Sequence, residues 1–428
     1  MRTLAEVVDW IYSHRGAIWR RKLDRIERLS ELVGVPSGGA ARFIHVAGTN
    51  GKGSVTSMVE AMMREAGLKT GSCYSPYVYS VRERAMVGGE LISEEDFVRG
   101  GNKLREAVQI LEGEGFGKPT VFELFTALAF WYWKEERVDT AAVEVGLGGI
   151  LDCTNIIDPA VSAIVSIGFD HMDVLGDTLG EIALEKAGVA KPGRPLVLGD
   201  VPAEARDVIC SYAQSVGAAV DVYGEDWRIR PNVDQAKFGL VSRFGNFDLP
   251  KPRRLRGAIQ THNAAVAAMS FLHFSYGELE LGEQIRVISR GLERAFLPGR
   301  FEVVRSRGRT WIFDGAHNEQ AASELVRSFR QEYPGIRPGV IFGMLSSHDP
   351  ATVLNQIDLL GGLVRCVPID WSLSADPKEL VALTQNGRAF DSISAALDDV
   401  AEEVVFVTGS FYLLKDVRDL LNGGQTDK

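Results

Sequence analysis

The sequence lacks the features that mark membrane-spanning, secreted and disulfide-rich proteins. Its 428 residues include only 4 cysteines, none of them spaced as C-x-x-C, and this usage suits a reducing compartment. No apolar run reaches the length of a membrane-spanning helix, and acidic residues stand near the N-terminus where a signal peptide would be apolar. We therefore expect a cytoplasmic protein with no membrane partner.

Dense basic runs are missing as well. The chain has 57 acidic and 47 basic residues, which give a net charge of −10, and basic pieces such as Arg253-Arg254 are short. Surfaces that bind nucleic acid need concentrated positive charge. The composition therefore argues against a nucleic-acid partner, and we find no internal repeat.

The length of the chain predicts two domains, because one hydrophobic core rarely serves 428 residues. The stretch L-P-G-R at 297–300 has the composition of a linker. We place the boundary there, so that the expected domains are residues 1–296 and 297–428.

The chain does contain a glycine-rich turn, in the stretch F-I-H-V-A-G-T-N-G-K-G-S-V-T at 43–56. The apolar residues before the turn predict a buried strand, and those after it recur with the period of a helix. Glycines let backbone N–H groups and the helix N-terminus converge on phosphate oxygens. The turn therefore predicts a phosphate site, to which Lys52 adds a positive charge.

The match to the P-loop pattern G-x-x-x-x-G-K-[ST] is a variant, because Gly53 is inserted between Lys52 and Ser54. The alternative is a glycine-rich turn with a solvated lysine. The strand before the turn and the helix after it favour the phosphate site.

Four other polar residues have a structural and a functional interpretation. Ser75 ends a short strand before a proline, as many turn-forming serines do. Glu144 interrupts a buried strand near the end where open α/β sheets bind ligands, and an unpaired carboxylate is costly there. His171 follows the next strand, and Lys186 lies on a helix. A single histidine or helical lysine is more often structural or solvated, so the residues alone leave both interpretations open.

The second half of the chain predicts a mainly parallel sheet, because strands near 310–313, 339–342, 363–367 and 404–407 alternate with helical stretches. The motif D-G-A-H-N at 314–318 follows one of these strands. T-G-S at 408–410 follows the last. We expect both motifs at one edge of this sheet.

Taken together, these pieces resemble the folylpolyglutamate synthase and dihydrofolate synthase family of the Mur ligase superfamily. The resemblance covers the chain from residue 23 to residue 412, and its motifs stand in the order of that family: H-V-A-G-T-N-G-K-G-S, S-P-Y with E-R downstream, F-E, E-V-G-L-G-G-x-L-D-x-T-N, D-H, E-K-A-G, L-P-G-R-F and D-G-A-H-N. Each motif is weakly specific alone, whereas the ordered set is strongly specific.

The resemblance implies an α/β protein with a P-loop-type Mur ligase central domain, followed by a smaller Rossmann-like C-terminal domain. It implies an ATP-dependent ligase that adds L-glutamate to folate, to dihydropteroate or to both. ATP would phosphorylate the acceptor's carboxylate, and the amine of glutamate would displace phosphate from the acyl phosphate. The expected cofactors are ATP and Mg²⁺ at two sites, and the expected state is a monomer.

The resemblance also assigns roles to individual residues. Those expected to bind ATP are Asn50, Gly51, Lys52, Gly53, Ser54, Asn263, Arg300 and Asp314. Ser75 and Glu144 would bind one Mg²⁺ and His171 a second, while Lys186 would carry a carbamate formed from CO₂ and its neutral amine. The expected catalytic residues are Lys52, Glu144, His171 and Lys186.

Further residues match the substrate-binding region of similar enzymes. Those expected near the pterin are Phe122, Glu123, Asp152, Thr154 and Asn155. His317 and Ser410 are expected near the nucleotide or glutamate. Glu123 also has a structural explanation, as the capping-box partner of Thr120 at a helix start, and Thr178 with Glu181 predicts a second capped helix start.

Four positions depart from the common family pattern, namely Tyr77, Ile150, Ile259 and Glu319. They leave open a divergent Mur-type ligase that couples an amino acid to another carboxylate. A second alternative is an ATP-binding paralogue without catalysis, although Glu144, His171 and Lys186 together argue against it.

Overall fold

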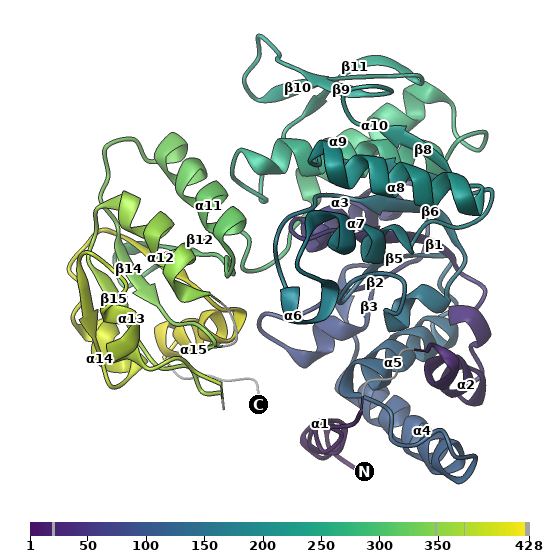
Figure 1. Ribbon diagram of the computed structural model, residues 1–428, viewed down its shortest axis with the longest axis horizontal. Helices are drawn as coiled ribbons and strands as arrows, with labels where there is room; N and C mark the ends of the chain where they lie inside the picture. The colour runs from purple at the N-terminus through teal and green to yellow at the C-terminus, as the bar shows by residue number, and fades with distance from the viewer. Residues whose placement is uncertain (19–21, 347–348, 372, 424–428) are drawn as a thin grey trace. The chain divides into compact units, whose positions relative to one another are not determined.

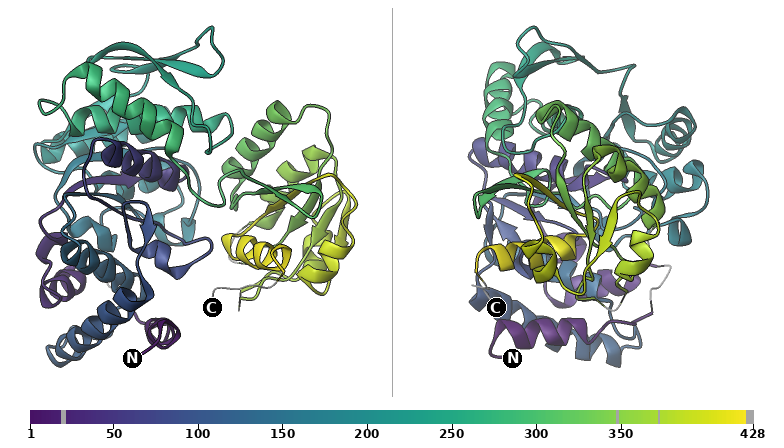
Figure 2. Two further views of the ribbon diagram at one scale, coloured as in Figure 1. Left: turned by 180° about the vertical axis from the view of Figure 1, so that it is seen from behind. Right: turned by 90° about the vertical axis from the view of Figure 1, so that its left-hand side faces the viewer.

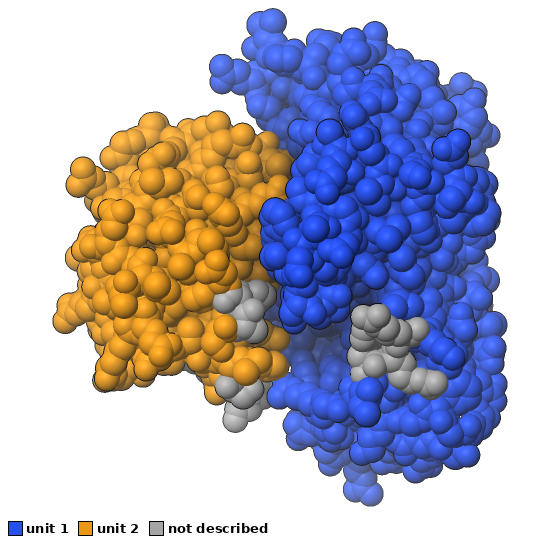
Figure 3. All heavy atoms as spheres, viewed as in Figure 1, with its two compact units in different colours: residues 1–253, 261–295 blue, residues 254–260, 296–428 orange. Residues whose placement is uncertain are grey.

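The computed structural model describes residues 1–18, 22–346, 349–371 and 373–423. The chain divides into two compact units (Figure 3). Unit 1 comprises Met1–Arg253 and Thr261–Ala295, and unit 2 comprises Arg254–Gln260 and Phe296–Lys428. Each unit has a sheet and a hydrophobic core of its own.

Unit 1 is built on an eight-stranded sheet in the order β4-β3-β2-β5-β1-β6-β7-β8 (Figure 1). Its strands are β1 (Arg42–Ala47), β2 (Thr70–Cys73), β3 (Met86–Val87), β4 (Glu90–Leu91), β5 (Thr140–Glu144), β6 (Pro159–Ile164), β7 (Pro195–Leu198) and β8 (Ala219–Val222). The six strands from β2 to β8 in this order are parallel, while β3 and β4 form an antiparallel edge. A separate antiparallel sheet contains β9 (Arg228–Arg230), β10 (Lys237–Ser242) and β11 (Gly245–Pro250).

Helices surround the large sheet. They are α1 (Leu4–Tyr12), α2 (Asp24–Leu32), α3 (Lys52–Glu65), α4 (Glu94–Gly113), α5 (Val121–Glu135), α6 (Met172–Leu175), α7 (Leu179–Ala187), α8 (Ala203–Val216), α9 (Ile259–Phe274) and α10 (Leu281–Arg294). Short 3₁₀ segments are η1 (Pro36–Gly38), η2 (Val81–Arg84) and η3 (Cys153–Ile156). The capping boxes predicted at Thr120 and Thr178 are both present and begin α5 and α7.

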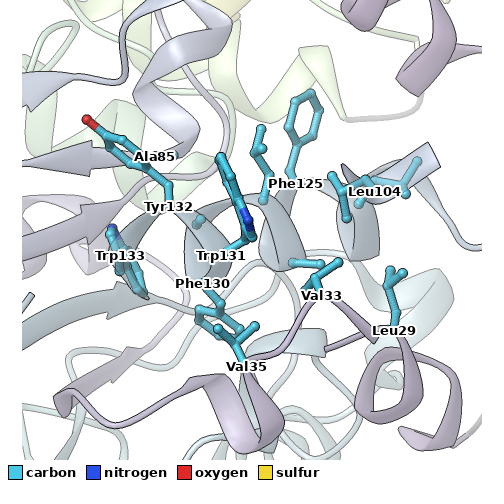
Figure 4. Packing of buried hydrophobic residues seen from close by; sticks show 14 of the residues in the cluster. Leu29, Val33, Val35, Ala85, Leu104, Phe125, Phe130, Trp131, Tyr132 and Trp133 are labelled. Atoms are coloured by element: carbon cyan, nitrogen blue, oxygen red, sulfur yellow. The ribbon is translucent and has the colours of Figure 1, made fainter. Parts of the chain in front are cut away.

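The centre of one core is α5, which is buried along nearly its whole length. The helix contacts α1, α2 and α4, and its aromatic side chains fill the core (Figure 4). Phe125 packs against Tyr12 of α1, whereas Phe130 and Trp133 pack against Phe43 of β1. Burying such large rings supplies much of the driving force for folding. This packing fixes the N-terminal end of α5, where Phe122 and Glu123 lie.

Unit 2 holds a six-stranded sheet in the order β12-β13-β17-β14-β15-β16. Its strands are β12 (Glu302–Ser306), β13 (Arg309–Phe313), β14 (Gly339–Phe342), β15 (Val364–Cys366), β16 (Gly387–Ala389) and β17 (Val404–Thr408), and only β12 runs antiparallel to its neighbour. The helices are α11 (Glu319–Glu332), α12 (Pro350–Ile357), η4 (Asp358–Leu360), α13 (Pro377–Val381), α14 (Ile393–Asp398) and α15 (Phe411–Leu421). They cover both faces of this sheet (Figure 2).

The mainly parallel sheet expected for the second half of the chain is therefore confirmed. Among the described residues, no helix combines the length and the apolar character that a membrane span needs.

Candidate functional site

The predicted site residues of unit 1 gather at one edge of its sheet. Val46 on β1 pairs with Glu144 on β5, and Ala47 pairs with Ile164 on β6. The parallel strands β2, β5, β1 and β6 thus end side by side. Ligands bind at this carboxyl edge in open α/β sheets, because the loops that follow the strands converge there.

The glycine-rich turn connects β1 to α3, as the sequence predicts. Gly51 precedes the first residue of α3, with a left-handed φ of 84°. Gly48 has a φ of 145°, and a Cβ there would lie 3.2 Å from the backbone N of Ser166. Only glycine combines this φ with so close an approach, so the turn can fold tightly against the loop after β6.

Hydrogen bonds hold the turn against this loop. The backbone N–H of Asn50 donates to Ser166 Oγ, and Ser166 Oγ–H donates to the carbonyl of Asn50, both at 2.9 Å. Thr49 Oγ1 bonds to the backbone of Gly168 at 3.0 and 3.1 Å. Ser166 and Thr49 therefore fix the turn, although the sequence analysis did not single them out.

Asn263 on α9 lies against the same turn. A Cβ at Gly51 would approach Asn263 Oδ1 to 2.7 Å. Gly53 and Ser54 are buried in the first turn of α3. The structure thus brings together the predicted nucleotide residues of unit 1, namely Asn50, Gly51, Lys52, Gly53, Ser54 and Asn263.

A polar pocket, which we call the lysine pocket, opens beside the turn. It is lined by Gly48, Thr49, Lys52, Val145, Gly146, Leu147, Gly148, Asp170, His171 and Lys186. Lys52 Nζ donates to the carbonyls of Gly48 and Thr49 at 3.0 and 3.1 Å. Burial, together with the charge of Lys52, lowers the pKa of the Lys186 amine to about 7.

His171 reaches the lysine pocket from the loop after β6. Its φ of 49° is left-handed, which is uncommon for a residue other than glycine. Its backbone N–H donates to Asp170 Oδ1 at 3.0 Å. Backbone conformations of this kind cluster at functional sites, where the surrounding structure maintains them.

A second pocket, which we call the aromatic pocket, lies on the other side of the end of β5. It is lined by Cys73, Tyr74, Ser75, Arg84, Phe122, Phe125, Thr126, Glu144 and Thr154. The backbone N–H of Ser75 donates to Glu144 Oε2 at 3.0 Å. The predicted Ser75–Glu144 pair is therefore in contact.

The Ser75–Glu144 pair fits Mg²⁺ by its chemistry, because a hydroxyl and a buried carboxylate are hard oxygen ligands. Within the described part of the chain, no group of three His, Cys, Asp or Glu side chains is arranged to hold a metal ion. His171 lines the lysine pocket and not the aromatic one. Its predicted metal role is thus separate from that of Glu144.

Asp152, predicted to contact the pterin, is occupied by internal hydrogen bonds. Its carboxylate accepts from the backbone N–H groups of Gly146, Leu147 and Thr154, and from the hydroxyl of Thr154. A carboxylate has about four acceptor positions, and these four donors use them. Asp152 therefore has a structural role in shaping the loop between the two pockets.

This network extends to His45, a residue of β1 that the sequence analysis missed as a site residue. His45 Nε2 lies 2.7 Å from Thr154 Oγ1. Because the Thr154 hydroxyl donates to Asp152, it accepts from His45, which places the imidazole proton on Nε2. Burial lowers the pKa of His45 to about 3, so the ring is neutral. A histidine inside an apolar strand was the available signal.

Glu123 and Asn155 also have structural partners. Glu123 completes the capping box of α5 and accepts from the buried guanidinium of Arg25. The side-chain amide of Asn155 donates to the carbonyls of Ile150 and Gly188. Phe122 faces Gly146, where a Cβ would lie 2.4 Å from its ring. Of the predicted pterin residues, Phe122 and Thr154 line the aromatic pocket.

In unit 2, the predicted residues gather around Phe411 at the carboxyl ends of β13 and β17. Arg300 lies over the ring of Phe411 at 4.6 Å, and the His317 ring lies 5.9 Å from it. Ser410 caps α15. Buried Asp314 accepts from the N–H groups of Phe301 and Ala316, and its burial raises its pKa.

The positions that depart from the family pattern are spread over both units. Tyr77 Oη lies 2.9 Å from Tyr12 Oη, which ties the loop after β2 to α1. Ile150 packs directly against Gly188, so closely that a Cβ on Gly188 would overlap the Ile150 side chain. Ile259 and Glu319 begin α9 and α11. None of them lines either pocket.

Comparisons with known proteins agree with this geometry. The family described as Mur ligase, glutamate ligase domain, matches residues 299–411. The dihydrofolate synthase/folylpolyglutamate synthase of Bacillus subtilis strain 168 is 32% identical over 432 residues, which cover 96% of this chain and 98% of that protein.

Solved structures are similar over nearly the whole chain. E. coli FolC in complex with DHPP and ADP has a TM-score of 0.86 and 30% identity, covering 98% of both chains. Mycobacterium tuberculosis folylpolyglutamate synthase complexed with ADP and AMPPCP has a TM-score of 0.87 at 26% identity, again covering 98% of both chains.

The fold and the phosphate-binding turn, together with these similarities, define an ATP-dependent ligase of the Mur ligase type. Within that class, the chain belongs to the folylpolyglutamate synthase/dihydrofolate synthase family. The fold class, the family and the ligase activity predicted from the sequence are confirmed.

Proposed function

We propose that this ligase joins L-glutamate to a pteroyl acceptor after converting the acceptor's carboxylate into an acyl phosphate. The observation that carries the proposal is the meeting of two pockets at the end of β5. The lysine pocket suits a polyphosphate, and the ring-lined aromatic pocket suits an acid with an aromatic body. The similar B. subtilis protein is named for both dihydrofolate and folylpolyglutamate synthesis.

Phosphoryl transfer depends mainly on positioning and charge neutralisation. The backbone N–H groups of the turn and the N-terminus of α3 would hold the phosphates, with Lys52 at the β- and γ-phosphates. An acceptor carboxylate oxygen would attack the γ-phosphorus, and ADP would leave. The amine of glutamate would then attack the acyl carbon, lose a proton and expel phosphate.

Ser75 and Glu144 would hold one Mg²⁺, and His171 would contribute to a second. The bound ion would neutralise charge on the phosphate oxygens. Glu144 is suited to this task because its burial keeps competing water away. The backbone N–H of Ser75 already orients the carboxylate.

Lys186 would carry a carbamate. Only a neutral amine adds to CO₂, and the lowered pKa of Lys186 makes this form available near neutral pH. NMR of the protein in ¹³C-bicarbonate should show a carbamate carbon at pH 8 that is absent from Lys186→Met. A spectrum without a difference between the two proteins would exclude the modification.

In unit 2, we expect Arg300 and Asp314 to serve the nucleotide, and His317 and Ser410 to serve the nucleotide or glutamate. Arg300→Ala should raise the KM for ATP while leaving the secondary structure intact. An unchanged KM would remove Arg300 from the nucleotide site.

The main experiment is glutamate-dependent ADP formation, measured separately with dihydropteroate and with a reduced folate. Activity with either acceptor supports the proposal and tells which reaction the enzyme performs. An acceptor labelled with ¹⁸O in its carboxylate should transfer one ¹⁸O to inorganic phosphate, since that oxygen bridges carbon and phosphorus in the acyl phosphate. Unlabelled phosphate would contradict the intermediate.

Two alternatives give different results in the same assay. A ligase for another carboxylate would form ADP only with non-pteroyl acids. A paralogue without catalysis would bind ATP and release no ADP with any acceptor.

We further propose that the protein is a monomer, and light scattering should give the mass of one chain. We also propose that it is located in the cytoplasm, where its four free thiols would stay reduced.

A further inference from the structure

Arg84 is the basic side chain of the aromatic pocket, and the roles proposed above do not use it. It is the last residue of η2, directly after Glu83. Its guanidinium carbon lies 5.3 Å from the ring centre of Phe125, 5.7 Å from that of Phe122 and 5.8 Å from that of Tyr77. Three aromatic rings, two from α5 and one from the loop after β2, therefore surround this cation.

The guanidinium is incompletely satisfied. Its Nε is buried and has no hydrogen-bond partner among the described residues. Neighbouring Glu83 interacts with Arg84 through its charge, but its carboxylate accepts hydrogen bonds from the backbone N–H groups of Val78, Tyr79 and Ser80. Burial lowers the pKa of Arg84, and this effect outweighs the opposing charge of Glu144.

Aromatic faces attract a cation but offer no lone pair in the plane of its N–H groups. A buried donor that stays unpaired is costly, and the cost is greater for a charged group. Arg84 supplies the positive charge of a pocket wall that Ser75 and Glu144 also line. A planar anion is the natural partner, since a carboxylate matches the guanidinium fork.

Glu144 shows why a cation matters in this pocket. When Mg²⁺ is not bound there, an incoming carboxylate would meet the negative charge of Glu144. A fixed cation in the same pocket offsets that repulsion. Tyr77, held by its hydrogen bond to Tyr12 on α1, keeps its ring on one side of Arg84.

We propose that Arg84 binds the carboxylate of the acceptor, the group that the ligase activates, while Phe122 and Phe125 contact the acceptor's aromatic body. This inference rests on the proposed function, because it takes the acceptor to be a ring-bearing carboxylic acid. Arg84 sets the specificity of the pocket for an acid over a neutral analogue.

The test compares the dissociation constants of dihydropteroate and of its carboxamide, measured by fluorescence titration in the absence of ATP. The wild-type protein should bind the acid about 10- to 100-fold more tightly, as expected for one charge-assisted pair. Arg84→Met should lose the affinity for the acid, keep that for the amide, and so abolish the preference. Arg84→Lys should keep part of the preference for the acid over the amide.

Arg82→Met is the matched control, because Arg82 belongs to the same η2 segment but donates to the carbonyl of Ile92. This variant should keep the wild-type preference. An unchanged acid preference in Arg84→Met would overturn the inference, as would an equal loss of affinity for both ligands. If Arg84→Met does not fold, Arg84→Lys decides, since an undiminished preference in it also contradicts a bidentate contact.

The outcome separates this inference from the proposed function. A wild-type protein that binds neither ligand and forms no ADP with either acceptor contradicts the function itself. A wild-type protein that is active and whose acid preference survives the loss of Arg84 contradicts only the inference.

Discussion

The lysine pocket and the aromatic pocket share the end of β5 but have opposite chemistry. Glu144, the last residue of β5, lines the aromatic pocket, whereas Val145 and the residues after it line the lysine pocket. Successive side chains of an extended backbone point to opposite sides. A single strand end can therefore separate a site with two amines from a site with rings and a carboxylate.

The difference indicates how the two sites divide the reaction. Two neighbouring amines are unfavourable for each other and suit a ligand with several negative charges. The aromatic pocket contains one buried carboxylate and one guanidinium among aromatic rings, which suits a ligand with a single charge on an aromatic body. Substitutions in the two pockets should therefore affect different kinetic constants.

The largest expected effect is on the lysine pocket. Lys52→Ala should lower kcat by about 10²- to 10³-fold, because a charge that stabilises the transferring phosphoryl group is lost. The acceptor's dissociation constant should change little. Lys103→Ala on α4 is the control, since Lys103 is exposed and far from the turn in the sequence. Steady-state ADP formation measures both variants. Wild-type turnover in Lys52→Ala would contradict the assignment of phosphoryl transfer to the lysine pocket.

The second prediction concerns the stability of the lysine pocket. The folded protein lowers the pKa of Lys186 to about 7, from 10.5 in the unfolded chain. Between these pH values the unfolded chain binds the extra proton, so the free energy of unfolding rises with pH. In CO₂-free buffer, Lys186→Met should be more stable than wild type by on the order of 5 kcal/mol at pH 6.

This advantage of Lys186→Met should shrink toward pH 10, because the wild-type protein gains stability as the pH rises from about 7 to 10.5. Urea unfolding at pH 6, 8 and 10 measures the trend. Lys103→Met should show no such trend, because its side chain is exposed. A difference that is constant with pH would mean that the amine is not buried as a neutral group.

The third prediction concerns the network behind the aromatic pocket. Thr154→Val removes the hydroxyl that connects His45 to Asp152 and should lower the free energy of unfolding by about 1–3 kcal/mol. Thr154→Ser keeps the hydroxyl and is the matched control. Chemical denaturation distinguishes them, and equal stability of the two variants would show that the network contributes nothing.

The smallest effect is expected at the wall between the pockets. A Cβ on Gly146 would lie 2.4 Å from the ring of Phe122, so Gly146→Ala should displace that ring. We expect the KM of the acceptor to rise about 10-fold, equivalent to the loss of one aromatic contact, with a smaller change in the KM of ATP. Gly113→Ala, where a Cβ meets no atom within 4 Å, is the control. Equal changes in both KM values would show that the pockets are not independent.

Much of the secondary structure could be predicted from local patterns. The strand before the glycine turn, the helix after it and the capping boxes at Thr120 and Thr178 are confirmed. Caps and periodicity depend on neighbours within a few residues, which the sequence displays directly. The parallel order of the strands in unit 2 followed from their alternation with helices.

The networks could not be predicted in the same way. His45 and Thr154 are 109 residues apart, and Arg25 and Glu123 are 98 apart. Nothing in the sequence indicates that the Asp152 carboxylate would accept four internal hydrogen bonds. Nor does it indicate that the Nε of Arg84 would have no hydrogen-bond partner within the described part of the chain. Such pairings exist only once the strands and helices have packed.

The sequence by itself determined the class of this protein, because the ordered motifs and the apolar periods are local and survive in a linear list of residues. Tertiary structure alone decided how the polar groups divide between the two pockets. The reason is that burial and hydrogen bonding set the charge and the availability of each side chain, and both depend on neighbours that are distant along the chain.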